Sequence, residues 1–419
     1  MRRNLLAVTG GVLTGMATAP SAVTAAPVAK PIRKHVRTGM DRLAASKWDA
    51  LDGERVAVVS NLTAVDREYR HLVDRMHADK VRIAGIIGPE HGFRGSAPVG
   101  GNEGMGTDPR TGLRVYDGYL ATLDRWKSMF TESGATTVVF DIQDVGARFY
   151  TYIWTLYDSM AAAAELNLRY LVLDRPNPIG GSASGPMLTP AWASGVGKKE
   201  IVQRHGMTVG ELARFYQGEW LPKVRLEVIA CEGWNGGLFA ADTDVPWVMP
   251  SPNMPTPDTA LVYPGTCLFE GVASLSEGRG TTRPFELSGA PDLDFHWQER
   301  LAALDLPGAE FREAYFLPRV GKFVDQLCVG VELRVSDPGV FDPIAAATAM
   351  LIEAKRYPGF AWRKDPDTRP FFVDKLAGTD RFRTMIDAGA SVADVTGSWQ
   401  DDLAAFLRKR RPYLLYSRP

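Results

Sequence analysis

The 419-residue sequence predicts an α/β protein, with a Rossmann-like, doubly wound and mostly parallel sheet domain and a smaller α/β auxiliary domain. Two observations support this prediction. Short runs rich in β-branched residues alternate with helical stretches, and such alternation is typical of a parallel sheet with helices on both faces. Polar residues also follow the ends of these runs, where sheets of this class bind their ligands. We therefore expect an active site in a cleft between the two domains.

The expected elements can be read in chain order from these runs. Strands are expected over 55–61, 81–87, 136–140, 170–173 and 226–230, and helices over 71–79, 119–131 and 151–166. Thr208 and Glu211 form a capping box, which predicts a helix from there to about Gly218. A strand over 330–335, a helix over 343–355 and a helical pattern over 392–409 complete the chain. We place the catalytic domain at 38–288 and the auxiliary domain at 289–419.

Charge and cysteine content indicate which partners and cross-links are not expected. The net charge is -1 and no basic face or domain stands out, so nucleic acid is not an expected partner. The three cysteines are widely spaced, show no metal-binding spacing and permit at most one internal disulfide.

The amino terminus predicts export. Residues 1–25 have a positive start at Arg2-Arg3, an apolar core too short to span a bilayer, and small residues before Ala25, all of which are typical of a signal peptide. We expect a periplasmic or extracellular protein with no membrane helix after cleavage. Residues 26 to about 37 are expected to form a basic tether.

Candidate site residues cluster after the predicted strands. The loop Gly88–Gly95, GPEHGFRG, directly follows the strand over 81–87 and carries a carboxylate, an imidazole and a guanidinium. Because the carboxyl ends of parallel strands share one edge, polar residues after four strands are predicted to form one active-site rim. These residues are Asn61, Glu90, His91, Asp141, Asp144, Asp174 and Asn177.

A second group of polar residues is expected to face this rim. The Pro-dense segment 249–257 has a rigid extended backbone and supplies Asn253 as part of a cleft wall. The loop that follows Tyr263 carries Glu270, Glu277, Arg279 and Arg283. The sequence contains no GxSxG, HExxH or phosphate-loop motif and no complete dinucleotide fingerprint, so we expect neither a metal nor a cofactor.

Several long strings together resemble one family. GPEHGFRG, FDIQDVGARFYTYIWTL, LDRPNPIGG, PSPNMPT, YPGTCLFEG, SEGRGTTRPFE and PYLLY are similar to the exo-β-N-acetylmuramidases, glycoside hydrolases long catalogued as a domain of unknown function. The resemblance covers about residues 50–419. It implies a Rossmann-like domain without a nucleotide and a cleft beside an auxiliary domain. The implied reaction releases N-acetylmuramic acid from the non-reducing end of muropeptides or MurNAc-GlcNAc disaccharides, with Glu90 as a catalytic residue.

Glycoside cleavage usually requires two carboxyl groups, one of which protonates the leaving group. Glu90 is the expected acid, and Glu277, Glu270, Asp141 and Asp144 remain candidates for the second group. Planar guanidinium groups pair bidentately with carboxylates, which suits the lactyl carboxylate of muramic acid. Candidate arginines for this contact are Arg94, Arg148, Arg279 and Arg283.

Two other functional classes remain open from the sequence. One is a cell-wall glycan binding protein that keeps the cleft without turnover. The other is a metal-dependent esterase or amidase that uses His91, Asp141 and Asp144.

Overall fold

The computed structural model describes residues 33–98, 100–365 and 370–418. The predicted signal peptide, 1–25, lies outside the described residues. By its internal contacts, Arg33–Pro419 forms one unit. Within the described ranges, no helix has both the length and the apolar character needed to cross a membrane.

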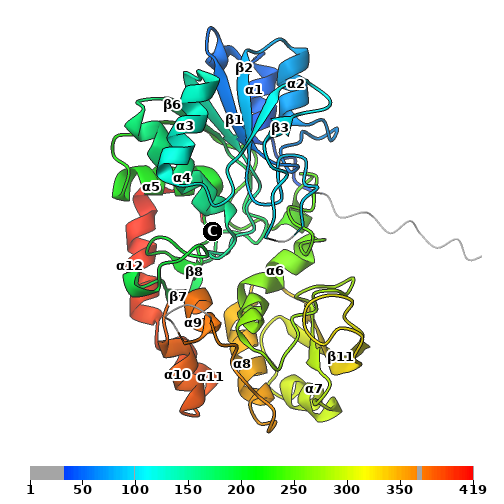
Figure 1. The fold of residues 1–419 in the computed structure, drawn as a ribbon. Helices are drawn as coiled ribbons and strands as arrows, with labels where there is room; N and C mark the ends of the chain where they lie inside the picture. Colours follow the sequence, from blue (N-terminus) through cyan, green and yellow to red (C-terminus); the bar gives the residue numbers. More distant parts are fainter. Residues whose placement is uncertain (1–32, 99, 366–369, 419) are drawn as a thin grey trace, which may run out of the picture. The chain divides into compact units, whose positions relative to one another are not determined.

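Seven strands form the main sheet in the order β3-β4-β2-β1-β5-β6-β9 (Figure 1). Neighbours pair in parallel except β3 with β4. If the six parallel strands are numbered along the chain, their order across the sheet is 3-2-1-4-5-6, which is the Rossmann order. The switch point of this order lies between β1 and β5. The predicted fold class is therefore confirmed. The strands are β1 (Val56–Ser60), β2 (Ile83–Gly88), β3 (Gly106–Thr107), β4 (Arg114–Asp117), β5 (Thr137–Asp141), β6 (Arg169–Leu173) and β9 (Arg225–Ile229).

Helices cover both faces of this sheet because successive strand side chains point to opposite sides. In β1, Val56 and Val58 join one apolar core, whereas Ala57 and Val59 join the other. The first core lies under α1 and α2, and the second under α3, α4 and α5 (Figure 1). These helices are α1 (Gly39–Ala45), α2 (Leu72–Ala78), α3 (Leu123–Ser133), α4 (Tyr152–Glu165) and α5 (Val209–Glu219).

The carboxyl-terminal part has its own antiparallel sheet, in the order β10-β12-β11. The predicted domain boundary between 288 and 289 falls within β10, and the division into domains remains a prediction. The elements of this part are α6 (Pro257–Thr266), β10 (Leu287–Ala290), α7 (Phe295–Ala302), β11 (Ala309–Phe316), β12 (Cys328–Val335), α8 (Pro343–Ala354), α9 (Phe372–Ala377), α10 (Arg381–Asp387), α11 (Val392–Gly397) and α12 (Gln400–Arg410). A separate two-stranded sheet consists of β7 (Ser184–Met187) and β8 (Val202–Arg204). The described chain also contains the short 3-10 helices η1 (Asp49–Leu51), η2 (Pro190–Trp192), η3 (Ala240–Asp242), η4 (Cys267–Gly271) and η5 (Arg411–Tyr413).

Several segments differ from the sequence-based expectation. The sequence does not predict β3 or β4, which lie between the Glu90 loop and α3. Residues 33–37 are packed rather than a free tether, since Val36 is fully buried and Arg37 pairs with Glu232. The helical pattern over 392–409 is two helices, α11 and α12, because Trp399 leaves the helical conformation and buries its indole.

Candidate active site

The Glu90 loop is shaped by a tight turn after β2. His91 and Gly92 both adopt left-handed backbone conformations, with φ of 69° and 82°. A Cβ on Gly92 would lie 2.2 Å from the side chain of Glu103, so only glycine fits this turn. Glu103 in turn accepts hydrogen bonds from the backbone N–H groups of Arg94 and Ser96. The loop conformation therefore holds Glu90 in place.

The Glu90 carboxylate is half-buried and hydrogen-bonded on both oxygens. Thr151 donates its hydroxyl to Oε2 over 2.8 Å, and the Gly100 N–H donates to Oε1 over 3.2 Å. Tyr119 also lies beside it, and burial together with the Glu90 charge raises the pKa of the Tyr119 phenol. Thr151 directly precedes α4, so the start of this helix positions the carboxylate.

Glu90 lines a pocket of about 160 Å³. Its walls come mainly from the β2 loop, the start of α4 with the residues before it, the Pro-dense segment and the α6–η4 region, and other loops and α9 add single residues. Aromatic rings make up much of the wall, including Tyr150 and Tyr263, whose centroids are 5.7 Å apart. The other lining residues are His91, Phe149, Thr151, Tyr152, Val196, Ser251, Asn253, Met254, Cys267, Glu270, Arg279, Phe285 and Leu376.

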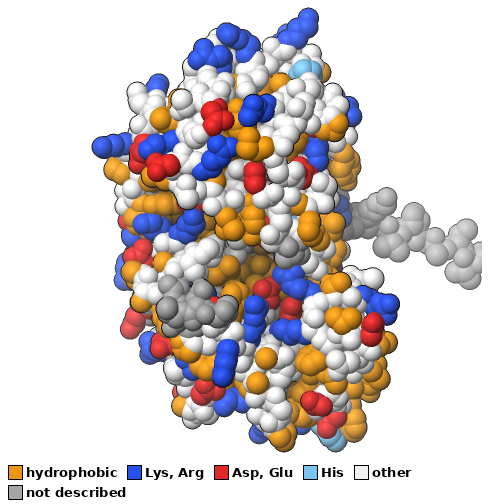
Figure 2. Space-filling model, in the orientation of Figure 1, with side chains coloured by type: hydrophobic (Ala, Val, Ile, Leu, Met, Phe, Trp, Pro, Cys, Tyr) orange, Lys and Arg blue, Asp and Glu red, His pale blue; other side chains and the backbone are white. Residues whose placement is uncertain are grey.

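A second pocket of about 590 Å³ adjoins the first one. Both pockets are lined by Asn253, Glu270 and Arg279, so together they form one cleft, which we call the Glu90 cleft. Figure 2 shows a hollow in the middle of the visible face with acidic and basic side chains gathered along its lower rim. The second pocket is completed by Ala273, Glu277, Val320, Gly321, Lys322 and Arg363.

Ion pairs connect four of the five charged residues of the second pocket. Arg279 lies 2.6 Å from Glu270 and 3.5 Å from Glu277. Lys322 lies 2.9 Å from Glu277 and also donates to the backbone carbonyls of Phe269 and Leu275. Burial lowers the pKa of Lys322, and Glu277 opposes this effect.

The structure brings six of the predicted site residues to the Glu90 cleft. Each of these residues lines at least one of the two pockets. They are Glu90, His91, Asn253, Glu270, Glu277 and Arg279.

Asp141 and Asp144 lie in buried networks rather than in the cleft lining. Asp141 accepts both hydrogen bonds of a bidentate pair with Arg175, at 2.5 and 2.9 Å. Asp144 accepts from the Gly146 N–H at 2.7 Å and pairs with His205 at 3.1 Å. Neither carboxylate lines a described pocket of the cleft. Both positions tie the rim loops to one another.

Arg148 is fully buried and donates to three backbone carbonyls, those of Pro186, Ile201 and Leu376. Burial without a described carboxylate partner lowers its pKa to about 9. Arg148 therefore joins the two-stranded β7–β8 sheet to α9 rather than lining the cleft.

Three further predicted residues bind the backbone beside the sheet edge. The side-chain oxygen of Asn61 accepts from Thr63, and its backbone carbonyl lies 2.8 Å from the His71 ring. Asp174 accepts from the Gly210 N–H and the Tyr416 hydroxyl. The remaining member, Asn177, donates to the Met207 carbonyl and accepts from the Ile179 N–H.

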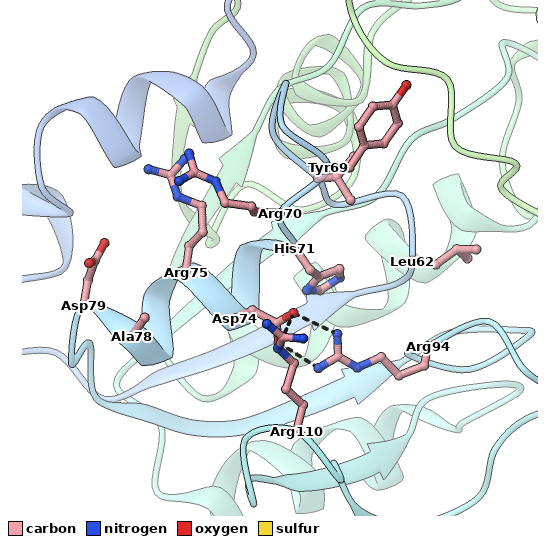
Figure 3. Close-up of a pocket in the computed structure, with 11 residues that line it drawn as sticks. Leu62, Tyr69, Arg70, His71, Asp74, Arg75, Ala78, Asp79, Arg94 and Arg110 are labelled. Atoms are coloured by element: carbon pink, nitrogen blue, oxygen red, sulfur yellow. Dashed lines mark hydrogen bonds and ion pairs between the residues drawn. The ribbon is translucent and has the colours of Figure 1, made fainter.

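Arg94 lines a different pocket, of about 610 Å³, shown in Figure 3. There it pairs with Asp74 at 2.8 Å and with Asp108 at 2.9 Å, and Arg110 approaches the same Asp74. Arg283 also lies away from the Glu90 cleft, where it pairs with Glu286 at 2.8 Å.

The cleft contains residues that the sequence analysis did not single out. Tyr150 and Thr151 belong to the FYTYIWTL string, so their motif pointed to the site although no role was assigned. Lys322 and Arg363 lie in segments with no recognisable motif, and only the tertiary structure brings them to the second pocket.

The three residues considered for a metal-dependent reaction each form hydrogen bonds with a different partner. His91 lies 3.1 Å from the Pro98 carbonyl, Asp141 binds Arg175, and Asp144 binds His205. Across the described part of the chain, no group of three or more His, Cys, Asp or Glu side chains is placed to hold a metal ion.

Two family models match nearly the whole described chain. The model for the amino-terminal part of the exo-β-N-acetylmuramidase NamZ matches residues 56–258, and the model for its carboxyl-terminal part matches residues 261–416. The chain belongs to the exo-β-N-acetylmuramidase family. The predicted family and enzyme class are confirmed, and the chain is a glycoside hydrolase.

Individual proteins of known sequence or structure are similar to this chain over nearly its whole length. The chain is 39% identical to the peptidoglycan β-N-acetylmuramidase NamZ of Bacillus subtilis (strain 168), over 99% of this chain and 100% of that protein. A crystal structure of a DUF1343 family protein from Bacteroides fragilis NCTC 9343 superimposes with a TM-score of 0.82 at 29% identity, covering 91% of this chain and 99% of that chain. The crystal structure of a second DUF1343 family protein from that organism superimposes with a TM-score of 0.72 at 32% identity, covering 92% of this chain and 99% of that chain.

The two exo-β-N-acetylmuramidase models meet between residues 258 and 261, and the Glu90 cleft draws residues from both sides of this point. Glu90 and Tyr150 come from the amino-terminal match, and Tyr263 and Glu270 from the carboxyl-terminal match. Both matched parts are therefore needed to build the pocket around Glu90.

Proposed function

We propose that the Glu90 cleft releases N-acetylmuramic acid from the non-reducing end of peptidoglycan fragments. One observation carries the proposal. Glu90, on the loop that follows β2, lines a pocket that also holds a second carboxylate, Glu270. Two carboxyl groups facing one pocket supply what glycoside hydrolysis requires.

In this proposal Glu90 is the general acid that protonates the glycosidic oxygen. Thr151 and the Gly100 N–H orient the carboxyl group, and orientation of the reacting groups contributes strongly to rate. The aromatic wall that includes Tyr150 and Tyr263 excludes water from one side of the sugar.

Glu270 is the proposed second carboxylate. It lines both pockets, whereas Glu277 lines only the second pocket and is bound to Lys322. Arg279 contacts Glu270 at 2.6 Å and fixes its position. A negative charge there would stabilise an oxocarbenium-like transition state.

The substrate class calls for a location outside the cytoplasm, and we include export in the proposal. Its support is the sequence of residues 1–25, with a positive start, a short apolar core and small residues before Ala25.

The test compares two matched chromogenic substrates, p-nitrophenyl β-N-acetylmuraminide and p-nitrophenyl β-N-acetylglucosaminide, with the purified mature protein. They differ only in the lactyl ether. We expect cleavage of the muraminide and at least tenfold lower kcat/KM on the glucosaminide, since losing one charged contact costs about that factor or more. Equal rates on both, or hydrolysis of neither, would contradict the proposal. Muraminide binding without nitrophenol release would identify a glycan binding protein instead.

A further inference from the structure

The second pocket of the Glu90 cleft carries one positive charge in excess. Its lining contains three basic side chains, Arg279, Lys322 and Arg363, and two acidic ones, Glu270 and Glu277. Both carboxylates are within ion-pair distance of Arg279, and Glu277 is also paired with Lys322. The excess charge therefore belongs to the remaining cation, Arg363.

The other two cations are held in ion pairs with the glutamates of the same pocket. Lys322 has three donor hydrogens and makes three contacts, with Phe269 O, Leu275 O and Glu277. Arg279 contacts both glutamates and stacks over the Phe285 ring at 4.9 Å. The charge of each is already balanced by a glutamate, so a new anion at either would compete with an existing ion pair.

Arg363 is exposed and has no carboxylate partner within the described ranges of the chain. Its guanidinium donates to the Glu270 backbone carbonyl over 3.4 Å and lies 4.5 Å from the centre of the Phe372 ring. A guanidinium has five donor hydrogens, so most of them remain open. An unpaired guanidinium at a pocket wall suits bidentate binding of a carboxylate.

The backbone of Arg363 is fixed on both sides. Its N–H donates to Gly271 O over 2.8 Å, and its carbonyl accepts from the Phe372 N–H at 3.1 Å. These bonds and the stacking on Phe372 hold the guanidinium in place before any ligand arrives. Such preorganisation reduces the entropy lost on binding.

The volumes indicate which part of a substrate reaches Arg363. The pocket at Glu90 has about 160 Å³, which is below the roughly 300 Å³ at the lower end of ordinary ligand pockets. A sugar with its glycosidic oxygen at Glu90 must therefore extend a substituent into the adjoining pocket. N-acetylmuramic acid carries one acidic substituent, the lactyl ether, beyond those of N-acetylglucosamine.

We propose that Arg363 binds the lactyl carboxylate of the terminal muramic acid and thereby selects muraminides over glucosaminides. This inference rests on the proposed function of the Glu90 cleft. It replaces the four arginines that the sequence offered for this contact, since each of them is paired or buried.

The experiment measures kcat/KM for wild type, Arg363→Ala and Arg363→Lys on the muraminide, on its lactyl methyl ester and on the glucosaminide. We expect Arg363→Ala to lose roughly 10- to 100-fold on the free acid, the range for a charged hydrogen bond, and less than about twofold on the ester and the glucosaminide. For Arg363→Lys we expect a loss of kcat/KM on the free acid between those of wild type and Arg363→Ala, because lysine keeps the positive charge but cannot bind a carboxylate through two parallel hydrogen bonds.

A matched control is Lys364→Ala, which removes the same charge from the adjacent exposed residue and should change each rate by less than about twofold. Thermal unfolding of each variant verifies the fold. Equal losses on the acid and the ester, or no loss on the acid, would overturn the role of Arg363.

Failure of the proposed function can be distinguished from failure of this inference. A wild-type protein that hydrolyses no muraminide would contradict the function. Calorimetric titration with free N-acetylmuramic acid still decides the role of Arg363: weaker binding by Arg363→Ala, with no change for Lys364→Ala, supports it. Equal affinity of wild type and Arg363→Ala for the free acid would overturn it.

Discussion

Individual residues in this protein divide into those that line the cleft and those that build its frame. Glu90 belongs to the first group, since its carboxylate faces a pocket and is held by Thr151 and the Gly100 N–H. Asp141 and Asp144 belong to the second, since each is buried and bound to a basic residue, Arg175 or His205. Removing either partner of such a buried pair leaves an uncompensated polar group, which costs several kcal/mol.

Glu90→Gln keeps the shape of the side chain and removes its transferable proton. If Glu90 is the general acid, we expect kcat/KM on a natural MurNAc-GlcNAc disaccharide to fall by roughly 10²–10⁴-fold. The loss on an aryl muraminide should be smaller, because a nitrophenolate leaves with little protonation whereas a sugar alkoxide requires it. Steady-state kinetics on both substrates measures the difference.

The control for this prediction is Glu310→Gln, which makes the same chemical change on an exposed position of β11. It should leave both rates near wild type. A folded Glu90→Gln protein that hydrolyses the disaccharide at nearly the wild-type rate would remove Glu90 from the mechanism.

Among the elements, α2 shows how a helix start is coupled to the sheet edge. His71 is the residue before this helix, and its Nδ1 accepts from the Val73 N–H at 3.2 Å. Its other ring nitrogen is therefore the donor to the Asn61 carbonyl, 2.8 Å away. The ring also packs edge-on against Phe93, with centroids 5.0 Å apart. A neutral imidazole thus joins the end of β1 to the start of α2.

Protonation of His71 would remove the acceptor for Val73. Burial is the main cause that lowers the pKa of His71 to about 4, and Arg94 and Arg175 act in the same direction, whereas the Asn61 carbonyl and Asp74 oppose it. The unfolded chain takes up this proton near pH 6.5, and the native protein only near pH 4. The unfolded state binds more protons between these values, so the native state loses stability as the pH falls through this range.

We expect His71→Gln to flatten this pH dependence, because glutamine keeps a donor and an acceptor but does not titrate. Between pH 6.5 and 4 the wild type should lose about 3 kcal/mol more than the variant in free energy of unfolding. Urea denaturation at several pH values measures it. His296→Gln, at an exposed position of α7, should follow wild type. Parallel curves for wild type and His71→Gln would show that His71 does not titrate as described.

On the scale of the whole molecule, distant parts of the chain meet at the sheet edge. The segment after α12 returns to α5, where the Leu415 N–H donates to Glu211 at 2.9 Å and the Tyr416 hydroxyl donates to Asp174 (Figure 1). None of the described cysteines forms a disulfide, since Cys231, Cys267 and Cys328 are all free and buried, and Cys231 joins these links by donating its N–H to the Tyr416 hydroxyl. Packing and hydrogen bonds, rather than disulfides, therefore connect these described segments.

The prediction at this scale concerns export. If residues 1–25 form a signal peptide, the mature protein should begin at Ala26 and appear outside the cytoplasm. Mass spectrometry of the amino terminus in fractionated cells measures both properties. Deleting residues 2–25 should retain the protein in the cytoplasm and leave its activity on a soluble muraminide unchanged. A full-length chain starting at Met1 in the cytosolic fraction would contradict export.

The sequence by itself determined the place of the Glu90 loop and, in chain order, five of the seven strands of the main sheet, β3 and β4 being the exceptions. Both depend on local signals, namely short apolar runs rich in β-branched residues and a glycine-rich turn after a strand. It also determined the family through motifs such as GPEHGFRG. The capping box of α5 was predicted for the same reason, because Thr208 and Glu211 satisfy each other within one turn.

Only the tertiary structure decided which polar residues face the cleft. A carboxylate after a strand has the same local sequence signal whether it lines a pocket, as Glu90 does, or binds a distant residue, as Asp141 binds Arg175. Asp174 meets Tyr416, and Arg363 reaches the second pocket, through contacts between segments far apart in the chain. Strand and helix periodicity is set by neighbouring residues, but ion pairing and pocket lining are set by long-range packing, which no local pattern encodes.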